Sequence, residues 1–121
     1  MNFKRRTIVF EAADIEAESA FWAGLLDGTV EQKETWHNVW ADGDWHLAVQ
    51  LAPGYVPPTW PDGASSQQVH LDFYLEDLEA AHEKAIKLGA RLLKSADDPG
   101  ARTGFRVYAD PAGHIFCMAW P

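Results

Sequence analysis

The chain repeats one pattern of hydrophobic runs and turn residues, and this repeat limits its possible folds more than any other feature. In each half, a β-branched or aromatic run is followed by an aspartate and then by apolar residues at helical spacing. The first elements of the two copies lie 63 positions apart, as Thr7 and His70 do, and as Asp14 and Asp77 do. Self-similarity of this kind is typical of a duplicated structural unit.

Each copy has the pattern of one strand, one helix and three further strands. Aspartate N-caps and glycine stops predict helices between Asp14 and Gly28 and between Asp77 and Gly89. Runs of β-branched and aromatic residues predict the strands, which cover residues 7–10, 29–33, 35–40, 45–51, 69–75, 91–94, 105–109 and 115–120. The sequence therefore predicts an α+β fold with two tandem β-α-β-β-β units in a single domain over residues 1–121. The first unit covers 4–51, a linker rich in Pro, Gly and Ser covers 52–67, and the second unit covers 68–121.

Side chains alternate between the two faces of a strand, so parity assigns each one to a face. One set is apolar and is expected to pack under the helices: Ile8, Phe10, Leu47, Val49, Leu71, Phe73, Phe116, Met118 and Trp120. The other set includes His70, Asp72 and Tyr74 in the second unit, and His46 and Gln50 in the first. One unit has a curved sheet with a helix on its outer face. We therefore expect two units to form a half-barrel around a cleft lined by these polar side chains.

Composition excludes several classes of protein. The chain has 121 residues, of which 47% are hydrophobic, an ordinary value for a globular domain with a core. Its formal net charge is −8, which argues against nucleic acid or an anionic membrane as a partner and suits either a cationic ligand or plain solubility. Cys117 is the single cysteine, so no intrachain disulfide can form. The sequence shows no signal peptide and no membrane-spanning run, and we expect a cytoplasmic protein.

Several motifs resemble those of a known superfamily. They are DIEAESAFWAGLL at 14–26, HLDF at 70–73, DLEAA at 77–81, LGA at 88–90 and DPAGHIFC at 110–117. Together they resemble the vicinal-oxygen-chelate superfamily, which includes glyoxalase I, bleomycin-resistance proteins and extradiol dioxygenases. The resemblance covers nearly the whole chain and implies the curved half-barrel and a homodimer. It says less about activity, because this fold hosts many functions.

The resemblance also implies a divalent metal held by four side chains, one from the first and one from the last strand of each unit. The corresponding positions are Thr7, Gln50, His70 and Cys117, where a metalloenzyme of the superfamily usually has His, Glu or Gln, His and Glu. Threonine is a poor ligand for such metals, and Cys117 also departs from the pattern. This set argues against metal catalysis. If a divalent metal binds, the expected ligands are Gln50, His70 and Cys117.

The candidates for ligand binding are six residues of the predicted cleft face together with Trp45 of the hairpin. The six are His46, Gln50, His70, Asp72, Tyr74 and Cys117. His70 is also the candidate catalytic residue, as a general base or as an anchor for a substrate oxygen. Tryptophans of the hairpin and the linker can stack on a flat ligand or pack in a dimer interface. Cys117 can be a nucleophile or a small buried filler.

Two functions remain open on the sequence alone. The first is an enzyme related to the lyases, isomerases and dioxygenases of the superfamily, with a degenerate metal site. The second is a non-catalytic binder that sequesters an aromatic or cationic small molecule, as bleomycin-resistance proteins do. The acidic, tryptophan-rich composition favours binding.

Overall fold

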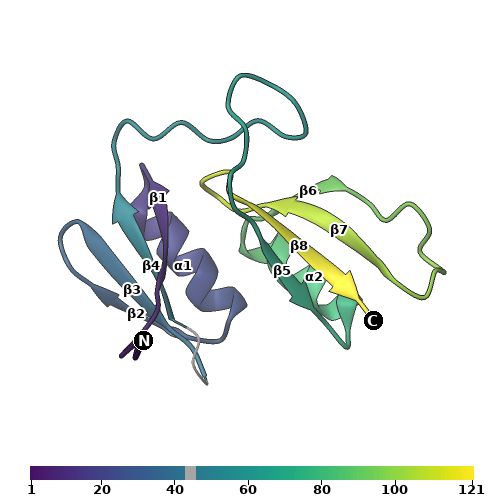
Figure 1. Cartoon of the computed structure of the whole chain (residues 1–121), viewed down its shortest axis with the longest axis horizontal. Coiled ribbons are helices and arrows are strands. Elements are labelled where there is room, and N and C mark those ends of the chain that lie inside the picture. Colours follow the sequence, from purple (N-terminus) through teal and green to yellow (C-terminus); the bar gives the residue numbers. More distant parts are fainter. Residues whose placement is uncertain (43–45) are drawn as a thin grey trace. The chain divides into compact units, whose positions relative to one another are not determined.

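The computed structural model describes residues 1–42 and 46–121 of the chain (Figure 1). The described residues form two compact units, Met1–Tyr55 and Val56–Pro121. Each unit holds one open four-stranded sheet and one helix. Two tandem units of this kind confirm the predicted α+β fold. No helix in the described part of the chain is long and apolar enough to cross a membrane.

The first unit begins with strand β1 and ends with strand β4, and these two strands pair in parallel. Its elements, in chain order, are β1 (Ile8–Ala12), α1 (Ile15–Leu25), β2 (Thr29–Gln32), β3 (Trp36–Trp40) and β4 (His46–Leu51). The sheet order is β1-β4-β3-β2, and the other two pairings are antiparallel. The edges of this sheet are therefore β1 and β2.

The second unit has the same topology. Its elements are β5 (Leu71–Tyr74), α2 (Leu78–Leu88), β6 (Arg91–Lys94), β7 (Gly104–Ala109) and β8 (Ile115–Trp120). The sheet order is β5-β8-β7-β6, in which β5 and β8 are parallel and the other pairs antiparallel. The register shifts between Leu92 and Lys94 of β6. Identical topology in the two sheets is the structural counterpart of the sequence repeat.

Both helices begin at the aspartates that the sequence predicts as N-caps. The side chain of Asp14 accepts a hydrogen bond from the backbone N–H of Ala17, and that of Asp77 accepts one from Ala80, each at 3.0 Å. These bonds satisfy backbone donors that have no partner within the helix. The second helix ends at Gly89, whose φ of 114° lies in the left-handed region that glycine adopts at no steric cost.

In the first unit, α1 covers one face of the sheet with aromatic side chains. Trp22 is fully buried, and its ring stacks on that of Phe10 with 5.4 Å between the centroids. Burial of Phe10 confirms the predicted parity of β1, but the prediction that Ile8 is buried is wrong, since Ile8 is 39% exposed. Ile8 is the first residue of β1, an edge strand whose one neighbour in the sheet is β4. Among the described residues, the other edge of the strand has no neighbouring strand to cover the Ile8 side chain.

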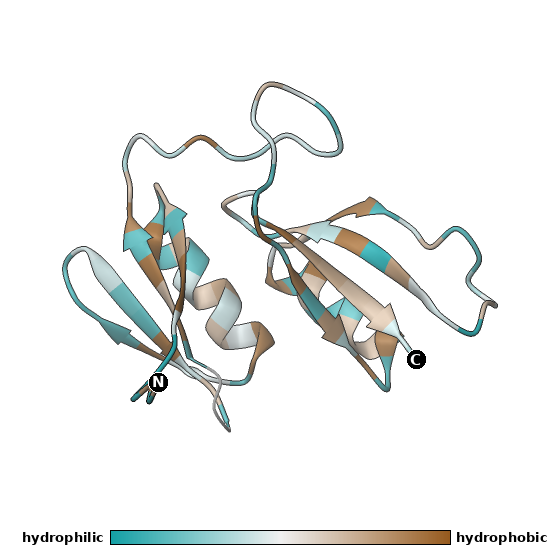
Figure 2. Ribbon diagram, viewed as in Figure 1, coloured by the Kyte–Doolittle hydropathy of each residue, from teal (hydrophilic) through white to brown (hydrophobic). Residues whose placement is uncertain are grey.

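In the second unit, the face of the sheet that packs against α2 carries Leu71, Tyr108, Phe116 and Met118, all buried. The rings of Tyr108 and Phe116 stack with 5.3 Å between the centroids. Brown and teal segments alternate along β5 and β7 in Figure 2, as expected for strands whose two faces meet different environments. The opposite face of this sheet, here called the open face, carries the candidate site.

Candidate ligand-binding site

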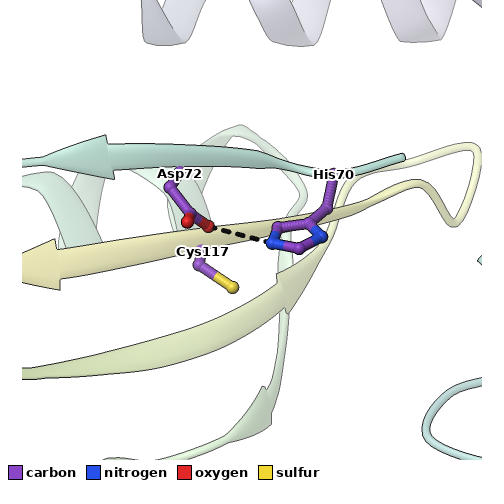
Figure 3. Close-up of side chains that lie close together, drawn as sticks. All are labelled: His70, Asp72 and Cys117. Carbon is purple, nitrogen blue, oxygen red and sulfur yellow. Dashed lines mark ion pairs between the residues drawn. The ribbon is translucent and has the colours of Figure 1, made fainter. Parts of the chain in front are cut away.

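Three chemically reactive side chains converge on the open face of the second sheet (Figure 3). Asp72 of β5 and Cys117 of β8 are register partners, so their side chains point to the same side. His70 lies two residues before Asp72 and shares its face by alternation. Nε2 of His70 is 3.2 Å from Oδ1 of Asp72, and the ligating atoms of all three side chains lie within 4.8 Å of one another. We call these residues the His-Asp-Cys cluster.

This cluster lines a pocket of about 610 Å³ that lies within the second unit. The size falls in the range of pockets that hold small organic molecules. Aromatic walls come from Tyr74 and Phe105, which are 71% and 49% exposed. Exposed rings at the rim of a pocket offer flat surfaces for stacking. The pocket can therefore take a small molecule with a flat apolar part.

Negative charge predominates in this pocket. Its lining includes the carboxylates of Asp72, Asp97 and Asp98 and a single ammonium group, that of Lys94. Nζ of Lys94 is 2.6 Å from Oδ1 of Asp97, so these two charges offset one another. Asp72 contacts the imidazole of His70, with 3.2 Å between Oδ1 and Nε2. The remaining carboxylate charge favours a cationic group over an anionic one.

Trp120, at the end of β8, approaches the backbone of β7 closely. A Cβ atom added at Gly104 would lie 2.4 Å from Cζ2 of Trp120, so only glycine leaves room for the indole. Nε1 of Trp120 donates a hydrogen bond to the carbonyl oxygen of Ala101 at 2.9 Å. The sequence places Trp120 among core residues. The register gives it the same face as Phe116 and Met118, and at the end of β8 it is half-buried.

Cys117 is the buried member of the cluster and has apolar neighbours. It is 8% exposed and belongs to a buried group with Val107, Ala109 and Ile115, against which the linker residue Trp60 packs. Burial, together with the charge of Asp72 and a hydrogen bond to its carboxylate, raises the pKa of the Cys117 thiol to about 11. Cys117 is therefore a protonated thiol at neutral pH in the metal-free protein. Of its two predicted roles, this disfavours a nucleophile and favours a small side chain that fills space in the buried group.

Alkylation kinetics test this assignment. In the presence of a chelator, iodoacetamide is expected to modify Cys117 at pH 8 at least about 100-fold more slowly than free cysteine, because its thiolate fraction is that much smaller. The rate should rise about tenfold per pH unit as the pH approaches the pKa of about 11. Asp72→Asn removes the neighbouring charge and should speed the reaction. Alkylation of the native protein at the rate of free cysteine would show that the thiol is neither buried nor next to a carboxylate.

In the first unit, His46 is part of a buried hydrogen-bond network. Its Nδ1 lies 2.8 Å from Oγ1 of Thr7, and its Nε2 lies 3.0 Å from Oδ1 of Asn38. Because Oδ1 of an amide only accepts, Nε2 is the donor, and Nδ1 accepts from the Thr7 hydroxyl. Burial, followed by the charge of Arg5, lowers the pKa of His46. His46 is thus held as a neutral, hydrogen-bonded residue stacked on Trp40.

The predicted ligand-binding residues belong to both units. His70, Asp72, Tyr74 and Cys117 line one pocket in the second unit. The first unit contains His46 and Gln50, of which Gln50 is exposed near the end of β4. Trp45 lies outside the described residues.

Sequence reasoning missed part of the pocket wall. Lys94, Asp97 and Asp98 come from β6 and the loop after it, where no periodic pattern assigns a face. The sequence could have placed Phe105 on the open face, because alternation along β7 puts it on the same face as Val107 and on the face opposite to that of Tyr108.

A family model described as the glyoxalase-like domain matches residues 7–119. The chain belongs to this family. The superfamily that the motifs resemble, that of the vicinal-oxygen chelates, is thereby confirmed. None of the curated proteins matches the chain. The functional interpretation therefore depends on the residues of this glyoxalase-like domain itself.

Solved structures share the fold at low sequence identity. A glyoxalase/bleomycin resistance protein/dioxygenase family enzyme from Burkholderia phytofirmans has 16% identity and a TM-score of 0.72, over 94% of this chain and 95% of that one. A glyoxalase-related enzyme from Fulvimarina pelagi has 19% identity and a TM-score of 0.70, over 98% and 89%. The fosfomycin resistance protein FosX from Listeria monocytogenes has 12% identity and a TM-score of 0.73, over 100% and 95%. At these identities the likeness shows the fold alone.

The four positions implied for a superfamily metal do not fit one in this glyoxalase-like chain. The hydroxyl of Thr7 is already engaged by His46, and a neutral threonine is a poor metal ligand. Gln50 offers a neutral amide oxygen. Only His70 and Cys117 of the four have strong donor atoms for a transition metal.

Proposed function

We propose that this glyoxalase-like protein binds a small planar aromatic cation in the pocket of its second unit, as a binder that needs no metal. The observation that carries the proposal is the pairing of aromatic walls with an excess of carboxylates in one pocket. Tyr74 and Phe105 supply the surfaces, and Asp72 supplies the charge. His70 would hold Asp72 in place through their contact of 3.2 Å.

The energetic terms favour a cation that is also aromatic. A cation over an aromatic face contributes roughly 0.5–2 kcal/mol, and stacking of flat rings adds to the burial of apolar area. An ammonium group 4 Å from a carboxylate gains about 4 kcal/mol at an effective dielectric constant of about 20, before desolvation is subtracted. Lys94 already lies 5.9 Å from the centroid of the Phe105 ring, so this pocket accommodates a cation against an aromatic side chain.

The same charges disfavour an anion. Fosfomycin is an anionic phosphonate, and a structural neighbour is described as a fosfomycin resistance protein. Three carboxylates against one lysine in the pocket of this chain would repel such a compound. We therefore assign the ligand by the chemistry of the pocket and not by the description of the neighbour.

Three naphthalene compounds of matched size test the proposed charge preference. In calorimetric titrations with a chelator present, 1-naphthylmethylammonium is expected to bind about tenfold more tightly than 1-naphthylmethanol, and 1-naphthoate more weakly than either. Asp72→Asn should weaken binding of the cation about tenfold and leave the alcohol nearly unchanged. Asp62→Asn makes the same charge change at an exposed residue of the same unit outside the pocket. It should leave all three affinities unchanged.

Two results would count against this function. Equal affinity for the cation, the alcohol and the acid would show that the carboxylates do not select the ligand. Equal losses in Asp72→Asn and Asp62→Asn would show that only the overall charge of the protein matters.

A further inference from the structure

The side chains of the His-Asp-Cys cluster bring three different kinds of metal-ligating atom close together. In the described part of the chain, it is the one group of three or more His, Cys, Asp or Glu side chains whose ligating atoms lie close enough together to hold a metal ion. An imidazole nitrogen, a carboxylate oxygen and a sulfur converge on one point of the open face (Figure 3). We propose that His70, Asp72 and Cys117 form a zinc-type metal site that lies wholly within the second unit and competes with the proposed aromatic cation.

The backbone fixes two of the three ligands. Asp72 and Cys117 are register partners on adjacent parallel strands, so their side chains start from one rung of the sheet. Tetrahedral zinc, at about 2.0 to 2.3 Å from its ligands, needs ligand atoms roughly 3.3 to 3.7 Å apart. The distance of 3.2 Å between Nε2 of His70 and Oδ1 of Asp72 is close to this spacing.

The remaining separations can close without a change of fold. All ligating atoms lie within 4.8 Å of one another. The side chains of His70 and Asp72 are 43% and 42% exposed, so rotation about their own bonds can bring them toward the buried sulfur. His70 precedes the first residue of β5, where backbone pairing does not restrain it.

The donor set selects the class of metal. Sulfur and imidazole suit zinc and similar transition metals, whereas magnesium and calcium prefer oxygen ligands. Three protein ligands leave one position of a tetrahedral ion to water or to an added molecule. This set differs from the four positions that the superfamily implies, because Asp72 takes the place of both residues from the first unit.

The metal and the aromatic cation are expected to compete because both use the carboxylate of Asp72. This part of the inference rests on the function proposed above. A metal that takes Asp72 removes the partner of the aromatic cation and adds positive charge at the same point. Metal binding itself does not depend on the identity of that ligand. The two parts of the inference can therefore fail separately.

Cobalt spectroscopy tests the metal site in the full chain, purified without a histidine tag. Stoichiometric Co²⁺ should give tetrahedral d–d bands and a near-ultraviolet charge-transfer band from sulfur to cobalt. Cys117→Ser should abolish the charge-transfer band, and His70→Ala and Asp72→Asn should each weaken Co²⁺ and Zn²⁺ binding at least tenfold. Asp62→Asn should bind both metals as the native chain does, because its carboxylate lies outside the pocket.

The outcomes separate the site from the function. A missing charge-transfer band, or equal losses in Asp72→Asn and Asp62→Asn, would overturn the metal site and leave the binding of 1-naphthylmethylammonium untouched. With the band present, one equivalent of Zn²⁺ should weaken 1-naphthylmethylammonium at least tenfold relative to a titration with chelator. Unchanged affinity would overturn the competition. If the naphthyl cation fails to bind in chelator while Co²⁺ binds through Cys117, the proposed function is wrong and the metal site stands.

Discussion

Replacing Trp22 with alanine is expected to lower the free energy of unfolding by about 3 to 5 kcal/mol, the usual cost of removing a buried indole or phenyl group. Trp22 is fully buried in the first unit and packs on both Phe10 and Phe21, with ring centroids 5.4 Å and 5.1 Å away. The substitution removes the apolar burial and leaves a cavity between α1 and the sheet. Urea denaturation followed by circular dichroism measures the loss.

Trp40→Ala is the matched control for this prediction. Trp40 belongs to the same unit, but it is 37% exposed and contacts Arg5 and His46 near the surface. We expect its loss to cost less than about 1.5 kcal/mol. Equal costs for the two tryptophans would contradict the packing of α1 described above.

The second large effect is expected at Asp110, in the turn between β7 and β8. Oδ1 of Asp110 accepts hydrogen bonds from the backbone N–H groups of Ala112 and His114, at 3.0 Å and 2.9 Å. Asp110 is 1% exposed, and Asp110→Ala leaves both donors without this acceptor in a partly buried turn. We expect a loss of about 2 to 4 kcal/mol. Thermal and urea unfolding of the variant measure it.

Asp110→Asn separates the hydrogen bonds from the charge. The amide oxygen can accept the same two bonds, so this variant should lose only about 1 kcal/mol. An asparagine variant as unstable as the alanine variant would show that the charge, and not the acceptor, stabilises the turn. The turn leads into β8, which carries Cys117, so the alanine variant should also bind 1-naphthylmethylammonium less well.

The fold could be predicted because its determinants are local. Asp14, Asp77 and Gly89 act within one turn of their helices, and their caps appear as predicted. Alternation along β5 assigned Leu71 to the core and left Asp72 and Tyr74 exposed, as the structure has them. Such signals require no knowledge of which strands pair.

The site was less predictable, because burial and charge depend on contacts between distant residues. Cys117 could be placed on the open face, but only the structure shows that Trp60 packs against its apolar group and that Asp72 lies beside the thiol. His46 has the expected parity, yet Thr7 and Asn38 engage both of its nitrogens. The catalytic role of His70, the homodimer and the cytoplasmic location stay predictions.

The central claim is that the pocket of the second unit is the ligand site, and an NMR titration tests it most directly. With ¹⁵N-labelled full-length protein in chelator, 1-naphthylmethylammonium should shift the amide signals of residues that line the pocket, foremost Asp72, Thr103, Phe105 and Ala119. Signals from β2 and β3 of the first unit should stay in place. Shifts confined to the first unit, or saturable binding with no shift at the pocket residues, would contradict the assignment.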